Sequence, residues 1–309
     1  MMNENGTIQY IKHEHVDKTK WDACMERAAN GMIYGYSYYL DTMVANWDVL
    51  VYNDYEFIMP LTWKSKWGIK YLYQPFITAQ LGIFGNQLTT AIRDRFIAAI
   101  PAQFKYIDIA LNFGNVQDAP HPFSFPRNNF TLDLNKHYET IYNQYNENTK
   151  RNIKKCNQLA GFVRKNIDVD KIISLAVAQM KVQGQESSDN ISRFKKLYQI
   201  LSEKGMATNY SVCLHEEDIA ASAVFFYSHQ RAYYILVGNA TSGRDSGASH
   251  ALIDAFIKDH AGKKIILDFE GSDIASLAAF YKGFGAGNEP YPALKINRLP
   301  FYLKWLKRR

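Results

Sequence analysis

The segment from Arg231 to Asp273, RAYYILVGNATSGRDSGASHALIDAFIKDHAGKKIILDFEGSD, predicts a strand, a short glycine-and-serine turn, a helix, a second strand and a second turn. The helix is expected to begin just after Gly247, and Arg244 stands just before that glycine. A helix start with free backbone N–H groups and a nearby arginine is a general site for anions. The same residues also fit an ordinary helix that a serine caps after a glycine turn. The segment therefore predicts either a phosphate site or a plain helix start.

Length and composition define the class of protein. The chain has 309 residues, of which 47% are hydrophobic and 21% are charged. Single cores stop growing at about 250–300 residues, so we expect two domains. The mean hydropathy of −0.31 argues against an integral membrane protein. The sequence shows neither a basic-then-apolar leader nor an apolar run of about 18 residues, so we expect a cytoplasmic protein.

Cysteines and net charge exclude several kinds of site. The cysteines are three, far apart and without a CxxC pair: Cys24, Cys156 and Cys213. Neither a disulfide framework nor a structural zinc site is indicated, and we expect no metal site. The net charge of +6 suits an anionic substrate without implying a nucleic-acid groove.

The two halves of the sequence repeat one order of elements. A three-stranded meander is predicted in residues 47–75 and again in residues 210–237. In each half a helix follows the meander, and then a strand that contains an aspartate, Asp108 or Asp268. Agreement over five elements indicates a duplicated domain.

The boundary between the two domains is expected near residue 140. We expect an N-terminal domain over residues 1–140 and a C-terminal domain over residues 141–309. A helical segment over residues 137–205 lies between the two repeats and is assigned mainly to the second domain. Because no low-complexity linker separates the domains, we expect them to share an interface.

The second half resembles the GNAT fold, in which the pyrophosphate of an acyl donor lies on an R/Q-x-x-G-x-G/A turn. Arg244, Gly247 and Ser249 occupy that pattern, with serine in place of the final glycine or alanine. The run LDFEGSD, followed by LAAFYKGFG at residues 277–285, is similar to signatures of FemAB-like and CelD-like acyltransferases, which are tandem GNAT proteins. The segment TKRNIKK at residues 149–155 resembles another of their signatures. The likeness therefore extends beyond one loop.

This resemblance implies an α/β (α+β) fold of two tandem GNAT-like domains, each a mixed, mostly antiparallel twisted sheet flanked by helices. It also implies that no cofactor is bound permanently and that acyl-CoA or an aminoacyl-tRNA is the co-substrate. The first domain has glycines in residues 80–86 but no arginine before them, so we expect donor binding in the second domain. A glycine late in a strand often marks a bulge where a ligand can pair. The residues expected to bind the donor are Val237, Gly238, Arg244, Gly247, Ala248 and Ser249.

Attack of an amine on a donor carbonyl needs a base and an acid for the leaving group. Asp268 and Glu270 alternate along a predicted strand, so we expect them to point the same way, and either could accept the proton of the amine. Asp268 could instead accept hydrogen bonds from the backbone of the next turn. Tyr281 stands where FemAB-like proteins usually have lysine, and it resembles the tyrosine that protonates the thiolate in ordinary GNAT enzymes. Simple packing is the alternative for Tyr281.

Aromatic clusters of the first domain are candidates for the acceptor side. By the resemblance, this domain helps to hold the acceptor, and an aromatic pocket wall is consistent with that role. Core packing explains the same aromatic residues. The substrate-binding candidates here are Tyr36, Tyr73 and Gln74.

Three cations of the second domain are further candidates for substrate binding: Lys150, Arg151 and Arg193. They could bind an acidic acceptor such as a sugar-nucleotide phosphate, or the phosphates of a tRNA. A solvated helix face is the alternative. The tail at residues 301–309 mixes aromatic and basic residues, which fits either weak contact with an anionic membrane surface or a docked terminus.

These features together predict an N-acyltransferase that moves an acyl or aminoacyl group from a CoA thioester or an aminoacyl-tRNA. The acceptor is expected to be an amine of a cell-wall precursor, an amino sugar or a related small molecule. The alternative is a non-catalytic ligand-binding protein on a GNAT scaffold, because a fold alone does not establish a reaction. Histidines, among them His250, show no catalytic order with serine and aspartate and are expected to be incidental.

Overall fold

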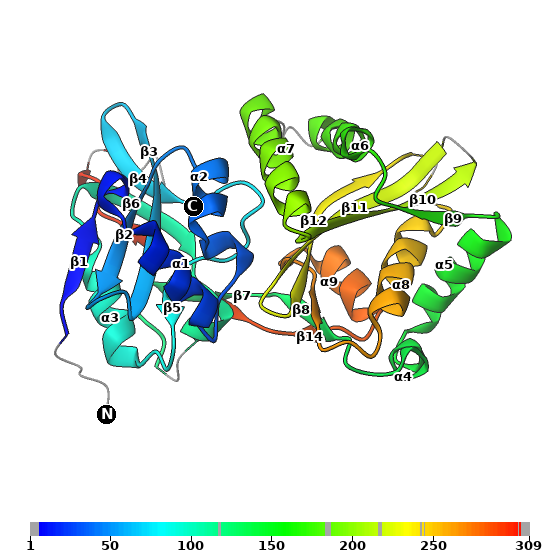
Figure 1. The fold of residues 1–309 in the computed structure, drawn as a ribbon, viewed down its shortest axis with the longest axis horizontal. Helices are drawn as coiled ribbons and strands as arrows, with labels where there is room; N and C mark the ends of the chain where they lie inside the picture. The colour runs from blue at the N-terminus through cyan, green and yellow to red at the C-terminus, as the bar shows by residue number, and fades with distance from the viewer. Residues whose placement is uncertain are drawn as a thin grey trace. The chain divides into compact units, whose positions relative to one another are not determined.

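The computed structural model divides the chain into two compact units (Figure 1). Unit 1 comprises residues 1–127 and 290–309, and unit 2 comprises residues 128–289. The structure describes residues 6–116, 119–182, 187–215, 218–241, 243, 245–301 and 303.

Unit 1 is built on a mixed sheet of eight strands in the order β1-β2-β3-β4-β6-β15-β7, with β5 paired to β3. The strands are β1 (Ile8–Ile11), β2 (Trp47–Tyr52), β3 (Phe57–Lys66), β4 (Ile69–Tyr73), β5 (Phe84–Gly85), β6 (Phe104–Ala110), β7 (Ser124–Arg127) and β15 (Tyr291–Asn297). Only β4 and β6 pair in parallel among these described strands. The helices are α1 (Lys18–Arg27), α2 (Ser37–Met43) and α3 (Thr90–Ala99), with short 3-10 turns η1 (His13–His15), η2 (Ile33–Gly35) and η3 (Phe113–Asn115).

Unit 2 is built on a seven-stranded sheet in the order β14-β8-β13-β12-β11-β10-β9. Its strands are β8 (Phe130–Asp133), β9 (Phe162–Lys165), β10 (Ala207–His215), β11 (Asp218–Ser228), β12 (Arg231–Asn239), β13 (Ile266–Asp268) and β14 (Gly287–Asn288). The parallel pair here is β12 with β13, and the other described pairs are antiparallel. The helices are α4 (Tyr138–Asn143), α5 (Glu147–Gln158), α6 (Val169–Val182), α7 (Ser188–Glu203), α8 (Ala248–His260) and α9 (Ala275–Lys282).

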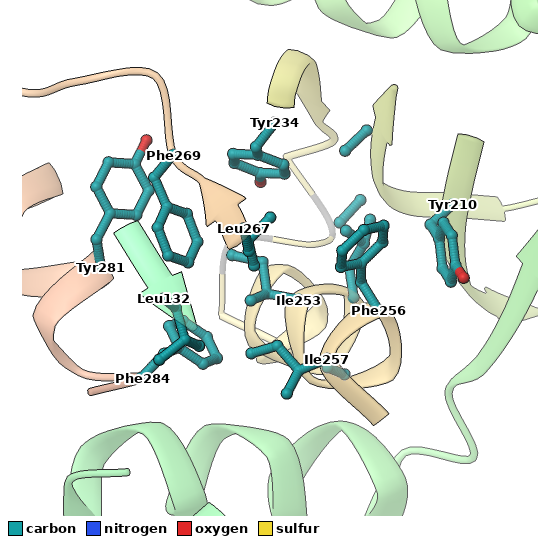
Figure 2. Close-up of a cluster of buried hydrophobic side chains, with 14 of the residues drawn as sticks. Leu132, Tyr210, Tyr234, Ile253, Phe256, Ile257, Leu267, Phe269, Tyr281 and Phe284 are labelled. Carbon is teal, nitrogen blue, oxygen red and sulfur yellow. The ribbon is translucent and has the colours of Figure 1, made fainter. Parts of the chain in front are cut away.

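Helix α8 is held by apolar residues at helical spacing, as its sequence pattern predicts. In Figure 2 the labelled residues Ile253, Phe256 and Ile257 extend from this helix into a buried hydrophobic cluster with the strand residues Leu132 and Leu267. The ring of Phe256 stacks on that of Phe225 of β11, with 3.8 Å between centroids. This packing holds α8 against the sheet of unit 2.

Both predicted meanders are present, and the fold class predicted from the sequence is confirmed. The strands β2, β3 and β4 form the first meander, and β10, β11 and β12 form the second. Each is followed by a helix and then by a strand that pairs in parallel with the last meander strand. The helical segment predicted over residues 137–205 begins with two separate helices: α4 ends at Asn143, and Asn146 caps α5 by accepting a hydrogen bond from the Thr149 N–H at 2.8 Å.

Two short strands are exchanged between the halves of the sequence. Strand β8 pairs with β13 of unit 2, with Leu132 opposite Leu267, although it precedes residue 140. Strand β15, near the end of the chain, pairs with β6 of unit 1, with Leu294 opposite Ile109. The units thus differ from the predicted division into residues 1–140 and 141–309. A strand of four residues has the same local pattern whichever sheet it joins, so its partner is decided by packing.

Every helix within the described ranges is too short or too polar to traverse a lipid bilayer.

Candidate functional site

The sheet of unit 2 opens at the middle of β12. Strand β13 pairs with β12 only from Arg231 to Tyr233, where Tyr233 lies opposite Asp268. The remainder of β12, from Tyr234 to Asn239, continues along β11. Within the described part of unit 2, no strand pairs with the other edge of this remainder. The edge is therefore available for other groups.

A cavity of about 390 Å³ lies at this opening. Its lining comes from the open part of β12, the glycine turn and first turn of α8, helix α9, and Gln179 of α6. The lining residues are Gln179, Tyr234, Val237, Asn239, Gly243, Gly247, Ala248, Ser249, His250, Ser276, Leu277, Phe280 and Tyr281. Among these described lining residues there is no aspartate, glutamate, lysine or arginine. The cavity therefore suits an uncharged part of a ligand.

The glycine turn before α8 is required by close packing. Gly247 has a φ of 80°, and a Cβ atom there would lie 2.1 Å from the carbonyl oxygen of Asn152 on α5. Ser246 Oγ donates to the Gly243 carbonyl at 2.8 Å and accepts from the Ala248 N–H at 3.2 Å. Gly247 offers no side chain to cap the helix, so its first turn faces the cavity with the partial positive charge of a helix N-terminus.

Of the six residues predicted to bind the donor, four line this cavity: Val237, Gly247, Ala248 and Ser249. Gly238 instead lies against α6, where a Cβ atom would come within 2.8 Å of the Ala176 nitrogen. Arg244 lies outside the described residues.

Polar contacts tie three elements together at the end of β12. The Asn239 N–H donates to Gln179 Oε1 of α6 at 3.0 Å. Ser249 Oγ of α8 donates to Asn239 Oδ1 at 2.6 Å. The backbone amide of Asn239, which belongs to the edge expected to pair with a donor, is thus occupied by the carboxamide of Gln179.

Two tyrosines of the cavity lining, Tyr234 and Tyr281, lie on either side of Phe269 (Figure 2). Tyr281 stacks on Phe269 with 4.6 Å between ring centroids, and Tyr234 meets the same ring edge-on at 6.1 Å. Burial, and then the negative charge of Glu270, raise the pKa of Tyr281 to about 12. Burial also raises the pKa of Tyr234. Both phenols are therefore protonated at neutral pH and able to donate a hydrogen bond.

Asp268 is buried in an ion pair and does not line the cavity. Its Oδ2 receives Arg231 Nη1 at 2.8 Å, and its Oδ1 receives the Glu270 N–H at 2.9 Å. Arg231 Nη2 also donates to Glu289 Oε1 at 2.7 Å. Burial raises the pKa of Asp268, and the charge of Arg231 opposes that rise. This network joins β12 to β13 just before the sheet opens.

Glu270 does not continue the alternation that the sequence predicts. Strand β13 ends at Asp268, and Glu270 has a φ of 66°, so the two carboxylates are not placed by one extended strand. Glu270 is half-buried beside the cavity rather than in its lining, and its charge acts on Tyr281. Of the three predicted catalytic residues, the structure therefore brings Glu270 and Tyr281 together and directs Asp268 to Arg231.

The aromatic acceptor candidates are all in unit 1. The Tyr36 hydroxyl is buried and donates to Glu26. Gln74 holds a loop, because its Nε2 donates to the Thr78 carbonyl at 2.7 Å and its Oε1 accepts from the Ala110 N–H at 2.9 Å. The Lys64 ammonium lies over the ring of Tyr73, 4.4 Å from the ring centroid.

The basic acceptor candidates are in unit 2 and lie outside the cavity lining. Lys150 is 3.3 Å from Glu147, and Arg151 donates to Asn148 Oδ1 at 2.7 Å, both within α5. Arg193 lies on α7. The same helix α5 touches the donor turn through Asn152.

His250 is the lining residue that sequence reasoning set aside. It is the third residue of α8, and its ring meets Phe280 edge-on at 4.7 Å. Burial lowers its pKa to about 4, so the imidazole is neutral at pH 7. Its position immediately after the predicted glycine turn is the feature of the sequence that could have marked it as a site residue. Tyr234, Asn239 and Gln179 carried no comparable signal, because each reaches the cavity through tertiary packing.

Comparison with solved structures identifies the fold. FemX superposes with a TM-score of 0.61 at 14% identity, covering 97% of this chain and 100% of that chain. The chain has the fold of FemX. The C-terminal domain of a putative lysylphosphatidylglycerol synthetase from Agrobacterium fabrum gives a TM-score of 0.54 at 9% identity, covering 94% of each chain. L-PGS from Bacillus licheniformis gives 0.53 at 9% identity, covering 94% of this chain and 95% of that one.

The predicted resemblance to tandem GNAT acyltransferases is thus confirmed at the level of the fold. No family model and no curated protein matches the sequence.

Proposed function

We propose that the protein is an N-acyltransferase whose acyl donor binds in the cavity of unit 2. The observation that carries this proposal is the cavity of about 390 Å³ between the open edge of β12 and the start of α8, whose N-cap residue Gly247 has no side chain. The helix start favours an anion such as a donor phosphate. The uncharged lining favours the neutral arm that links the phosphate to the acyl group. The fold shared with FemX is consistent with acyl transfer without establishing it.

The proposed reaction is attack of an acceptor amine on the carbonyl carbon of the donor. The new C–N bond forms as the bond from carbon to the leaving sulfur or oxygen breaks. Glu270 accepts the proton that the amine loses, directly or through a water, and the Tyr281 phenol gives its proton to the leaving atom. The raised pKa of Tyr281, about 12, keeps the phenol protonated until that step. Asp268 acts in this scheme as a positioning residue through Arg231.

The donor that best fits the lining is an acyl thioester of a phosphopantetheine carrier such as acyl-CoA. Its long arm is neutral and amide-rich, and the cavity offers amide, hydroxyl and aromatic groups without a carboxylate. An aminoacyl ester carries an ammonium group, for which the described lining has no acidic partner. Acyl-CoA is present in the cytoplasm, where we expect the reaction to occur.

Aminoacyl-tRNA is the second candidate donor, because helix α5 borders the donor turn. Its Asn152 carbonyl contacts Gly247, and its exposed cations include Arg151, Lys154 and Lys155. Such cations can neutralise the phosphates of an RNA. The acceptor is in either case proposed to be an amine of a cell-wall precursor, an amino sugar or a related small molecule.

Calorimetric titration with acetyl-CoA, free CoA, uncharged tRNA and aminoacyl-tRNA tests the proposal. We expect acetyl-CoA to bind with a micromolar Kd and tRNA to bind at least about tenfold more weakly at 150 mM salt. Tight binding of charged tRNA alone would favour the second donor. If neither donor binds and no amine is acylated, the protein is a binding module and the proposed reaction is wrong.

The Tyr281→Phe variant tests the assigned acid. We expect kcat to fall about 100-fold while the Kd for the donor stays within about twofold, since the ring and its packing remain. Glu270→Gln should lower kcat and flatten the acidic limb of the pH profile. Tyr142→Phe is the matched control, because Tyr142 packs on the same core outside the cavity lining. Unchanged rates in both test variants would remove Tyr281 and Glu270 from the mechanism.

A further inference from the structure

A second cavity, of about 320 Å³, lies in unit 1 and has no part in the proposed reaction. Three buried residues line it: Ile97 of α3, Leu111 directly after β6, and Tyr291 of β15. Its rim includes Val116 and Phe125, which are 51% and 38% exposed. Exposed side chains of this kind around an apolar hollow are typical of a ligand site.

The walls of this cavity are unusually stiff. Four of the lining residues are prolines, Pro120, Pro126, Pro290 and Pro292, and each has a fixed φ. Pro126 and Pro292 lie opposite each other in the pairing of β7 with β15. A cavity with rigid walls loses little entropy when a ligand enters, so it favours binding.

Two basic groups stand in a mostly apolar lining, whose other polar members include Asn115 and Ser124. Arg93 of α3 is buried, with its side chain 5% exposed, and its Nη1 donates to the Ala119 carbonyl at 2.8 Å. Its Nε and Nη2 both donate to Oδ1 of the half-exposed Asp94, at 2.8 and 2.7 Å. These contacts use three of the five N–H groups of the guanidinium and leave one on each of Nη1 and Nη2 for a ligand.

His121 provides a second donor. Its Nδ1 accepts a hydrogen bond from the Phe123 N–H at 3.3 Å, so the neutral ring carries its proton on Nε2. The described lining contains no aspartate or glutamate. The site therefore offers hydrogen-bond donors to an anion and offers no partner to a cation.

We propose that this cavity binds an apolar monocarboxylate, a hydrocarbon body that carries one carboxylate. The body lies on Ile97, Leu111 and Phe125, and the carboxylate meets Arg93 and His121. This site is independent of the donor cavity, because all its lining residues belong to unit 1. Unit 1, whose glycines in residues 80–86 have no arginine before them, then binds a ligand of its own.

Calorimetric titration of the full chain at pH 7.5 with octanoate, octanol and octylamine tests the proposal. We expect octanoate to bind at submillimolar concentration, octanol about tenfold more weakly, and octylamine not at all, because only the carboxylate pairs with the two donors. Equal binding of the three probes, or no octanoate binding at millimolar concentration, would overturn it.

Variants locate the bound probe. Phe125→Ser should weaken octanoate and octanol alike by about fivefold, because it removes apolar contact from the rim. His121→Ala should weaken octanoate by about fivefold and leave octanol unchanged. The matched control is Trp67→Ser, which removes another exposed aromatic of unit 1, 79% exposed and outside the lining. An equal loss in Trp67→Ser and Phe125→Ser would mean non-specific surface binding and would exclude the site.

Discussion

The two halves of the duplicated fold begin their equivalent helices in different ways. Helix α3 of unit 1 follows Thr89, whose hydroxyl accepts a hydrogen bond from the Ile92 N–H at 3.2 Å. Helix α8 of unit 2 follows Gly247, which has a φ of 80° and no side chain to cap the helix. The first helix start is closed by its own protein, and the second faces a cavity. A helix start whose N-cap residue has no side chain can therefore border a ligand cavity.

The sheets beside these two helices also differ, in how far the last strand of each meander is paired. In unit 1, β4 is paired with β6 along Lys70–Tyr73, which is all of β4 except its first residue. In unit 2, β12 is paired with β13 only along Arg231–Tyr233, and the strand then continues to Asn239. A longer last meander strand and a helix with glycine at its N-cap therefore occur together, at the opening where the cavity of unit 2 lies.

The largest effect is expected from breaking the ion pair at which the sheet of unit 2 opens. Arg231→Met should lower the free energy of unfolding of unit 2 by about 3–5 kcal/mol, because it leaves the buried Asp268 without its charge partner. The double variant Arg231→Met, Asp268→Leu should recover most of that loss. Urea denaturation followed by circular dichroism measures both.

Tryptophan fluorescence is the control for that experiment. The tryptophans within the described residues all lie in unit 1, so their signal reports on unit 1: Trp21, Trp47, Trp63 and Trp67. We expect the fluorescence midpoint to stay unchanged in Arg231→Met. A single variant as stable as the wild type would show that the pair does not hold β12 to β13.

The two glycines that flank α8 provide the next comparison. Gly247 and Gly262 both have φ near 80°, but a Cβ atom meets the Asn152 oxygen at 2.1 Å in the first and nothing within 4 Å in the second. Gly262→Ala should cost about 1 kcal/mol from backbone strain alone. Gly247→Ala should cost about 3 kcal/mol and weaken donor binding at least about tenfold, because α5 must move. Equal costs in the two variants would show that the contact with α5 is unimportant.

Much of this contrast could be predicted from the sequence, since it depends on local patterns. The apolar spacing of α8 and the alternation of the meanders indicated their elements, and Gly247 stood in a recognisable turn. The absence of an arginine before the glycines of residues 80–86 predicts that only the second half binds a donor, and this stays a prediction.

The other features of the site and of the fold depend on contacts between residues far apart in the chain, so the sequence did not predict them. Arg231 and Asp268 are 37 residues apart, and nothing near either one names its partner. Gln179 reaches the Asn239 amide across 60 residues. The exchange of β8 and β15 between sheets is likewise decided by packing, because short strands carry too little pattern to specify a neighbour.

A smaller effect is expected from the third residue of each helix, His250 in α8 and Ile92 in α3. The pKa of His250 falls to about 4 in the folded protein, against about 6.5 in an unfolded chain. Between pH 6.5 and pH 4 the unfolded chain therefore binds a proton that the folded chain does not. The free energy of unfolding thus decreases as the pH is lowered through this window, and His250 contributes no further change below pH 4. After allowance for partial exposure, the loss is about 1–2 kcal/mol.

His250→Ile, which gives α8 the residue of α3, should remove that part of the pH dependence. The measurement is the difference in unfolding free energy between the two proteins at pH 7, 5.5 and 4, in which other titrating groups cancel. A difference that is constant over this range would contradict the neutral, buried state of the imidazole.

The smallest effect is expected at the cap of α3. Thr89→Ala should cost about 1 kcal/mol, and Thr89→Gly only a few tenths, because glycine allows water to reach the amide that the hydroxyl now satisfies. Tryptophan fluorescence measures the loss in unit 1. Neither variant should change donor binding, and Thr89→Gly should not create a donor site, since β4 remains paired to its end. A second site for acetyl-CoA in Thr89→Gly would show that the cap alone, without the opened sheet, distinguishes the two halves.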